Sequence, residues 1–320
     1  MGLWSRLLDS SVVFSFDRSG FKRRAKHFTP DDPRADLSHL HVVITGANSG
    51  IGYGTAEALV GRGAQVTLVC RSQVRGEGAI AALRKQWPES RLTLRLADLS
   101  DLGSVRALAT EITEPIHALV HNAGNMLDEL SYTDDGIETI TALHVAGPYL
   151  LSLALLDNLA AGARQCHGRI IFVASGGMYT QPLDLATLKT PATPYDGTRH
   201  YALTKRAQVV LAERLNASLP PGVSAHAMHP GWVDTPAIRR AMPRFYAVTK
   251  PILRTPDQGA DTVFWLASTD ASTVAADPGF WFDRQRVPTH MSKKTQGLDE
   301  EEAGLVPFVE SLVHPPAPSV

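Results

Sequence analysis

A chain of 320 residues is long for one domain and short for two, which favours a single α/β domain of about 250 residues with terminal extensions. The formal net charge of −1 gives no electrostatic basis for binding nucleic acid, and no apolar run reaches the roughly 18 residues that a membrane-spanning helix needs. Only Cys70 and Cys166 are present, and Cys70 lies in an apolar run, so we expect free thiols, a reducing compartment and a cytoplasmic protein.

Residues 1–36 form an N-terminal extension for which two interpretations are open. Its first part places Leu3, Trp4, Leu7, Leu8, Ser11 and Val12 at helical spacing, and a basic cluster follows: Arg18, Lys22, Arg23, Arg24 and Lys26. An amphipathic helix followed by basic residues can lie on an anionic membrane, which predicts peripheral membrane contact through residues 1–28. The alternative is a helix packed over the domain, with a solvated basic turn after it.

From residue 39 onward, short β-like runs alternate with longer helical patterns, which is typical of repeated βαβ units. The predicted strands are His41–Thr45, Gln65–Cys70, Arg91–Leu96, His117–His121, Arg169–Ser175, Ser224–His229 and Gly279–Asp283. The predicted helices are Gly50–Arg62, Gln73–Gln86, Leu102–Glu111, Gly136–Leu159, Arg199–Leu219, Asp257–Ala267 and Asp299–Val313. We expect an α/β doubly wound (Rossmann) three-layer sandwich with a seven-stranded parallel sheet, as one domain over 37–298. A C-terminal helix and disordered tail fill 299–320.

The first predicted strand runs into the glycine-rich stretch Thr45–Gly52 and then into a helix. Glycine lets the backbone approach a pyrophosphate closely, and the free N–H groups of a first helical turn attract an anion. Such a turn alone also serves ordinary tight turns. The candidate dinucleotide-binding residues here are Gly46, Asn48, Ser49, Gly50, Ile51 and Gly52.

Other polar residues follow the later strands, whose carboxyl ends border the ligand crevice of a doubly wound sheet. Arg71 and Ser72 follow the second strand, where an arginine accommodates the 2′-phosphate of NADP(H) and an acid would bind the ribose of NAD(H). The alternative is that Arg71 only caps the end of the strand at the surface. We expect Asp98 and Leu99 to bracket the adenine, and Asn122, Ala123 and Gly124 to approach the ribose, although that tripeptide also suits an ordinary turn.

The chemistry is expected from Ser175, Tyr201 and Lys205. Tyr201 and Lys205 lie four residues apart, on one face of a helix. The Tyr201 phenol would protonate a carbonyl oxygen as hydride reaches the carbon, and Ser175 would be the second donor to that oxygen. A free phenol titrates near 10, so we expect the Lys205 charge and an oxidised nicotinamide to lower the pKa of Tyr201. Lys205 should also reach the nicotinamide ribose. The residues expected to flank the nicotinamide are His229, Pro230, Gly231, Val233 and Thr235.

Together these segments resemble the short-chain dehydrogenase/reductase family. The resemblance covers residues 39–285 and rests on TGANSGIG, HNAG, the strand ending at Ser175, YALTK and HPGW. It implies an oxidoreductase that uses NADPH/NADP+, and it implies the roles given above for the candidate cofactor-binding and catalytic residues. No metal is expected.

One position departs from the family pattern. The family places an Asn, in the motif Asn-x-x-Gly, where this chain has His144-Val145-Ala146-Gly147, and that Asn helps to hold a water that feeds protons to the lysine. We expect His144 to relay protons itself, with a pKa near 6.5 that makes turnover sensitive to pH. The alternative is an impaired relay and a slow enzyme.

The segment Trp232–Thr255 is predicted to form a mobile lid over the substrate. The apolar residues expected to line this lid are Trp232, Met242, Phe245 and Tyr246, together with Met178. They suggest that the substrate is a hydrophobic ketone or aldehyde, although they suit a plain hydrophobic core equally well. His290 is a further pocket candidate. The leading hypothesis is NADP(H)-dependent carbonyl reduction. The alternatives are NAD-linked oxidation of a secondary alcohol, such as a steroid or lipid, and a weakly catalytic dinucleotide-binding scaffold. A further expectation is an oligomer formed through helices 136–159 and 199–219, unless the N-terminal segment blocks that surface.

Overall fold

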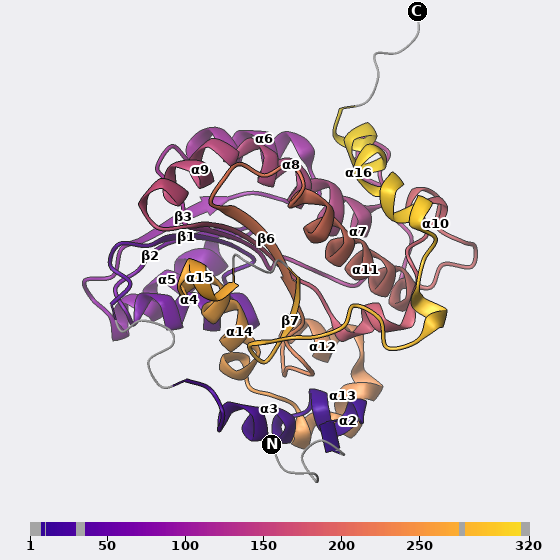
Figure 1. Cartoon of the computed structure of the whole chain (residues 1–320), viewed down its shortest axis with the longest axis horizontal. Coiled ribbons are helices and arrows are strands. Elements are labelled where there is room, and N and C mark those ends of the chain that lie inside the picture. The colour runs from indigo at the N-terminus through magenta and orange to yellow at the C-terminus, as the bar shows by residue number, and fades with distance from the viewer. Residues whose placement is uncertain (1–7, 10, 30–35, 275–278, 315–320) are drawn as a thin grey trace, which may run out of the picture.

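The computed structural model describes residues 8–9, 11–29, 36–274 and 279–314 (Figure 1). Most of the predicted N-terminal amphipathic helix (residues 1–7 and 10) and the predicted tail (315–320) lie outside the described residues. Within them, the extension forms α2 (Val12–Phe16) and α3 (Arg18–Ala25).

A mostly parallel sheet of eight strands forms the centre, in the order β3-β2-β1-β4-β5-β6-β7-β8. The strands are β1 (His41–Thr45), β2 (Gln65–Cys70), β3 (Leu92–Leu96), β4 (Ala118–His121), β5 (Gly168–Val173), β6 (Val223–Met228), β7 (Phe280–Phe282) and β8 (Gln285–Arg286). The doubly wound α/β sandwich is therefore confirmed, and the predicted strands match to within two residues.

The prediction of a seven-stranded parallel sheet is wrong by one strand, because β8 pairs antiparallel with β7. The two strands are joined by Asp283 and Arg284, which both have positive φ (48° and 60°). A two-residue hairpin turn needs this backbone, but glycine or asparagine usually provides it. The sequence therefore carries no ordinary signal for the hairpin.

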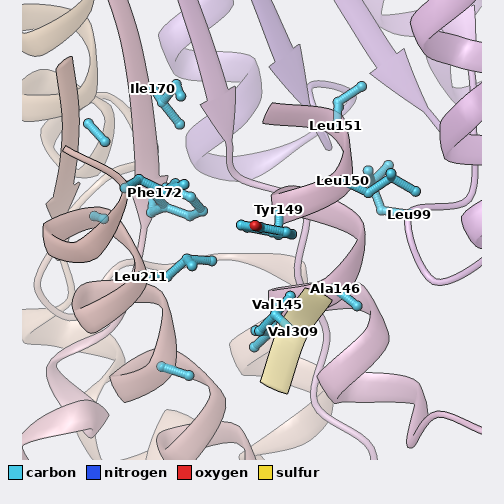
Figure 2. Packing of buried hydrophobic residues seen from close by; sticks show 14 of the residues in the cluster. Leu99, Val145, Ala146, Tyr149, Leu150, Leu151, Ile170, Phe172, Leu211 and Val309 are labelled. Atoms are coloured by element: carbon cyan, nitrogen blue, oxygen red, sulfur yellow. The ribbon is translucent and has the colours of Figure 1, made fainter. Parts of the chain in front are cut away.

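Helices cover both faces of the sheet (Figure 1). One face carries α4 (Gly50–Val60), α5 (Gln73–Gln86) and α14 (Pro256–Ser268); the other carries α6 (Leu102–Glu111), α8 (Gly147–Ala154), α9 (Leu156–Gln165) and α11 (Gly197–Leu215). In Figure 2 the Tyr149 side chain points from α8 toward Phe172 of β5, and Leu150 lies beside Leu99. Each large apolar side chain buried in this way contributes about 1.5–3 kcal/mol.

The predicted helix Gly136–Leu159 is wrong as one continuous helix. It is divided into α7 (Thr139–Thr141), the π-helical turn η1 (Ala142–Ala146), α8 and α9. Leu155 leaves helical geometry, and the axis bends by 59° there. No single helix of the described ranges is long and apolar enough to cross a membrane, although this bent pair meets those criteria when its two parts are taken together.

The C-terminal helix α16 (Asp299–Val313) has the predicted range and packs over α11, η1 and α8. Leu305, Val309 and Val313 are fully buried there, and the Tyr149 hydroxyl donates to Glu310 Oε1 at 3.1 Å. The surface expected to pair two copies is therefore covered in part by α16, not by the N-terminal segment.

The remaining helices are short and connect the layers. They are η2 (Gly176–Thr180), α10 (Leu185–Lys189), α12 (Pro236–Ala241), α13 (Pro243–Thr249), η3 (Lys250–Ile252), α15 (Ala271–Val274) and η4 (Lys293–Thr295).

Candidate active site

The glycine-rich turn between β1 and α4 leaves its backbone open to a ligand. Gly46 has a φ of +67°, and a Cβ there would lie 2.8 Å from Ala123 Cα. At Gly52 a Cβ would lie 2.4 Å from Asn122 Nδ2, so no larger residue fits either position. Ser49 precedes α4 without capping it through its side chain. The first N–H groups of α4 are thus free of a side-chain acceptor and suit a pyrophosphate, so the residues present fit a bound dinucleotide.

Thr45 and Asn122 fix the backbone of this turn through side-chain hydrogen bonds. The Thr45 hydroxyl accepts the N–H groups of Asn122 and Ala123, both at 3.0 Å. Asn122 Nδ2 donates to the carbonyl oxygens of Thr45 and Gly46. The Asn122 side chain is thus committed to shaping the turn. Thr45 was missed as a site residue, and its only signal was a hydroxyl at the end of an apolar strand.

The backbone of the turn also meets Cys70 at the end of β2. Burial raises the pKa of the Cys70 thiol to about 11, against the opposing effect of backbone hydrogen bonds from Ala47 and Asn48. Cys70 and Cys166 form no disulfide in the described part of the chain, and Cys70 is buried, as predicted.

Arg71 lies at the outer end of the proposed cofactor crevice. Its side chain is 77% exposed, and its guanidinium is 3.5 Å from the Asp98 carboxylate. Burial acts to raise the pKa of Asp98, but hydrogen bonds from Ser100 and the Arg71 charge outweigh it and lower that pKa. Ser72 caps α5 through its hydroxyl. The Leu99 side chain is buried against Leu150 and does not line the crevice (Figure 2).

Ser175, Tyr201 and Lys205 come together at the carboxyl end of β5. Ser175 lies just beyond β5, where its hydroxyl accepts the Gly177 N–H at 3.1 Å. The Ser175 hydroxyl is also near enough to the Tyr201 phenol to act on its pKa. Lys205 Nζ lies 5.6 Å from the centre of the Tyr201 ring. These three predicted residues are therefore brought together by β5 and α11.

The pKa of Tyr201 departs from the prediction. Burial raises it above 10, although the nearby Ser175 hydroxyl acts in the opposite direction. Burial also lowers the pKa of Lys205 to about 7, so the amine is only partly charged at neutral pH. The lowering expected from the Lys205 charge does not outweigh burial in this structure, and the part expected from an oxidised nicotinamide stays a prediction. A phenol with a raised pKa stays protonated, which is the form a proton donor needs.

His144 lies in the π turn η1, is fully buried and makes an edge contact with the Tyr201 ring. The Thr204 hydroxyl donates to the Tyr201 carbonyl, so it accepts from His144 Nδ1 at 2.8 Å. His144 Nε2 accepts the Asn125 N–H at 3.3 Å. The hydrogen-bond network thus assigns the proton to Nδ1.

The predicted titration of His144 near 6.5 is wrong. Burial lowers its pKa well below 6.5, and the Lys205 charge adds to this. A neutral imidazole with both nitrogens engaged does not take up protons near neutral pH. A Cβ on Gly124 would lie 3.1 Å from His144 Nε2, which places Gly124 beside this group.

The segment after β6 meets both the glycine turn and the predicted lid. The Thr235 methyl lies 3.3 Å from a Cβ built on Gly50, and Val233 is buried near Ile51. The segment predicted to be the lid contains α12, α13 and η3, and the Trp232 and Phe245 rings meet edge to face at 5.1 Å.

Three side chains that were predicted to border the nicotinamide or the substrate instead have structural roles. His229 is buried and stacks on Phe282 at 3.9 Å, so its ring belongs to the core. Met178 is fully buried, so it belongs to the core and not to the lid. His290 hydrogen-bonds to Thr295.

The N-terminal helices pack over the domain, as the alternative interpretation predicted, and they also form part of the wall of this site, which was not predicted. Phe16 packs against His229 at 4.5 Å and would meet a Cβ on Gly176, next to Ser175, at 2.4 Å. The Phe16 carbonyl accepts the Trp232 N–H at 2.9 Å. Phe16 therefore joins the extension to both the Ser175 turn and the start of the lid.

A buried charge network holds this junction together. Arg254 is fully buried and binds Asp283 through both NH groups, at 2.6 and 2.9 Å. Arg24 of α3 also binds Asp283, at 2.7 Å. Arg254 donates further to the carbonyl oxygens of Ser15, Phe16 and Pro230. Two arginines on one buried carboxylate thus connect α3, the lid and the β7–β8 turn.

The doubly wound sheet, the glycine turn and the Ser175, Tyr201 and Lys205 cluster are features of one class of enzyme, and the chain belongs to the short-chain dehydrogenase/reductase family. The family described as short chain dehydrogenase matches residues 40–244. The chain is an oxidoreductase of this family, as its motifs predicted.

Among individual relatives, the chain is 38% identical over 300 residues to dehydrogenase/reductase SDR family member 12 of Bos taurus, and the match covers 93% of each chain. It is 34% identical over 230 residues to human retinol dehydrogenase 12, covering 69% of this chain and 71% of the relative.

Solved structures show the same fold. A protein of Mycobacterium paratuberculosis has a TM-score of 0.67 and 27% identity, covering 88% of this chain and 96% of the other. A short-chain dehydrogenase from Sphingobium yanoikuyae in complex with NADPH has a TM-score of 0.56 and 26% identity. The match covers 72% of this chain and 86% of the other.

Proposed function

We propose that the protein is an NADP(H)-dependent reductase of hydrophobic ketones or aldehydes, with Tyr201 as the proton donor. The observation that carries this proposal is the cluster of Tyr201, Ser175 and Lys205 at the strand ends beside the glycine turn. NADPH, when bound, supplies the hydride. The Tyr201 phenol gives its proton to the carbonyl oxygen, and the Ser175 hydroxyl stabilises the negative charge developing there.

Lys205 supports this proton transfer electrostatically. As the phenol loses its proton, the adjacent ammonium favours the phenolate.

The remaining candidate roles, which concern cofactor binding, follow from the positions of the residues. The pyrophosphate would lie on the α4 turn (Gly46, Asn48–Gly52), with Asp98 near the adenine. The backbone of Ala123–Gly124 would border the ribose, and Pro230–Thr235 would border the nicotinamide.

The apolar lid supports a hydrophobic substrate. Trp232 and Phe245 present aromatic surface there, and Met242 is partly exposed between α12 and α13. The retinol dehydrogenase relative favours a substrate of the same apolar class. Following NADPH absorbance with retinal, a steroid ketone, a long-chain aldehyde and phenanthrenequinone tests the proposal. A protein that binds NADPH and reduces none of these probes would contradict the substrate class.

The preference for NADPH is proposed to depend on Arg71, whose exposed guanidinium suits a 2′-phosphate. Arg71→Asp is expected to weaken NADPH binding at least about tenfold, because one charge-assisted hydrogen bond contributes roughly 1.5–3 kcal/mol. NADH binding should change little or improve. The measurement is the dissociation constant of each cofactor by fluorescence titration. Lys85→Asp, the same charge change in the last turn of α5, is the control. Equal losses in both variants, or wild-type protein that prefers NADH, would favour the NAD-linked alternative.

We also propose peripheral membrane contact through the outer face of α2. Val12, Val13 and Phe14 are 45%, 41% and 48% exposed, and Lys22 and Lys26 are exposed on α3. Apolar side chains beside basic ones favour an anionic bilayer.

The test is a Val12→Asp/Val13→Asp variant, because deleting the extension would also remove Phe16 and Arg24 from the site wall. The double variant is expected to lose most flotation with phosphatidylserine-containing vesicles. Val74→Asp, at a 79% exposed valine on α5, should float like wild type. If all three proteins float alike, or none floats, the proposal fails.

A further inference from the structure

Gln208 is a fully buried amide one turn beyond Lys205 on α11. Lys205 Nζ donates to Gln208 Oε1 at 2.9 Å, and Gln208 Nε2 donates to the His144 carbonyl oxygen at 2.8 Å. Because an ammonium only donates and a carbonyl only accepts, these partners fix which end of the amide is oxygen. The amide thus ties the lysine of α11 to the π turn η1.

Pro148 explains why the His144 carbonyl is available to Gln208. In a regular α-helix the N–H of residue 148 would donate to this oxygen, but proline has no N–H. The helix widens here, where the Gly147 N–H donates to the Ala142 oxygen five residues back. A buried carbonyl needs a donor, and the Gln208 amide supplies one. Such π turns often lie at functional sites.

The second fixed partner of Lys205 is the Val173 carbonyl at the end of β5, at 2.9 Å. An ammonium has three N–H groups, and two of them are taken by Val173 and Gln208. In the described part of the chain the third has no hydrogen-bond acceptor. Two fixed acceptors on different elements hold Nζ in place and leave one position for the reaction, with Tyr201 one turn away.

We propose that Gln208 is a positioning residue that holds the Lys205 amine and favours its protonated form. The inference rests on the proposed function only in the role that function gives to Lys205. A hydrogen-bond acceptor at the ammonium favours the charged state, whereas burial disfavours it. Gln208 and Val173 are therefore the groups that offset the burial of this charge.

The other titratable groups facing Lys205 do not supply this stabilisation. Burial lowers the pKa of His121 on β4 to about 3 and that of His144 well below 6.5, so both are neutral near pH 7. Burial keeps the Tyr201 phenol protonated. The pKa of Lys205 itself is lowered to about 7 by burial, so the amine is charged below pH 7 and neutral above it.

The test is a ¹³C NMR titration of full-length protein labelled at lysine Cε, which needs neither cofactor nor substrate. The Lys205 resonance is assigned as the one missing from Lys205→Met. Gln208→Glu is expected to raise the Lys205 pKa by roughly 1–3, because a carboxylate then faces the ammonium. Gln208→Leu is expected to lower it, because an acceptor is lost. Gln86→Glu, on the exposed face of α5, should leave it unchanged.

Opposite shifts in the two Gln208 variants support the positioning role, since mere loosening of the fold would move both in the same direction. If Gln208→Leu does not fold, Gln208→Glu, which keeps the side-chain shape, still decides the matter. A Lys205 pKa unchanged in the folded variants would overturn the inference and leave the reductase proposal standing. Conversely, turnover that survives Tyr201→Phe would overturn the reductase proposal and leave the Gln208 result intact.

Discussion

Tyr201→Phe is expected to reduce kcat for carbonyl reduction at least about 100-fold, because general acid catalysis by a positioned side chain contributes 10²–10⁴-fold. The substitution removes only the phenol hydroxyl, which lies near Ser175. The ring that contacts His144 and lies near Lys205 remains. The dissociation constant for NADPH should therefore stay near its wild-type value. NADPH consumption with the best carbonyl probe and fluorescence titration of NADPH measure the two quantities.

Tyr149→Phe is the matched control for this experiment. It also removes one phenol hydroxyl, here one that donates to Glu310 Oε1, but Tyr149 lies in the core under α16. Its turnover should stay close to wild type. If Tyr201→Phe keeps wild-type turnover, another group donates the proton. If it loses NADPH binding as well, Tyr201 contributes to holding the cofactor and the kinetic effect is not assignable to proton transfer.

Asp283→Ala is expected to lower the free energy of unfolding by about 3–5 kcal/mol, because removing one partner of a buried ion pair leaves charge uncompensated. Arg254 and Arg24 would both lose their shared carboxylate, and Arg254 is fully buried. For a chain of this length the loss corresponds to a fall in Tm of roughly 5–8 °C. The same change should release α3, so trypsin should cleave the extension faster. Thermal denaturation and limited proteolysis measure these two effects.

Asp234→Ala provides the contrast, since Asp234 also pairs with an arginine through two hydrogen bonds but at the surface. An exposed pair contributes about 0–1 kcal/mol, so this variant should unfold near the wild-type temperature. Equal stability of the two variants would show that the buried network does not anchor the N-terminal helices.

The features that the sequence predicts well are those encoded by neighbouring residues. Apolar runs located the parallel strands because strands covered on both faces need no polar alternation. The glycine turn was readable because positions such as Gly46 admit no side chain. The i,i+4 spacing of Tyr201 and Lys205 placed both on one face of α11.

The features that escaped prediction depend on partners far apart in the chain. The β7–β8 turn forms at Asp283–Arg284 without glycine, and Asp283 is bound there by Arg24 and Arg254. The titration of His144 was misjudged because its burial follows from tertiary packing, which local sequence does not reveal. Gln208 was overlooked because a single glutamine on a helix carries no motif.

The Arg24–Asp283 pair has a consequence for the order in which the molecule is assembled. The two residues are 259 positions apart, and a ribosome adding about 5–20 residues per second makes the second roughly 10–50 s after the first. Throughout that interval Arg24 has no carboxylate at position 283 to bind, and the His229 and Trp232 partners of Phe16 are made only late in it. A segment made early is thus fixed late, and a nascent chain halted before Asp283 would lack the ion pair that holds α3.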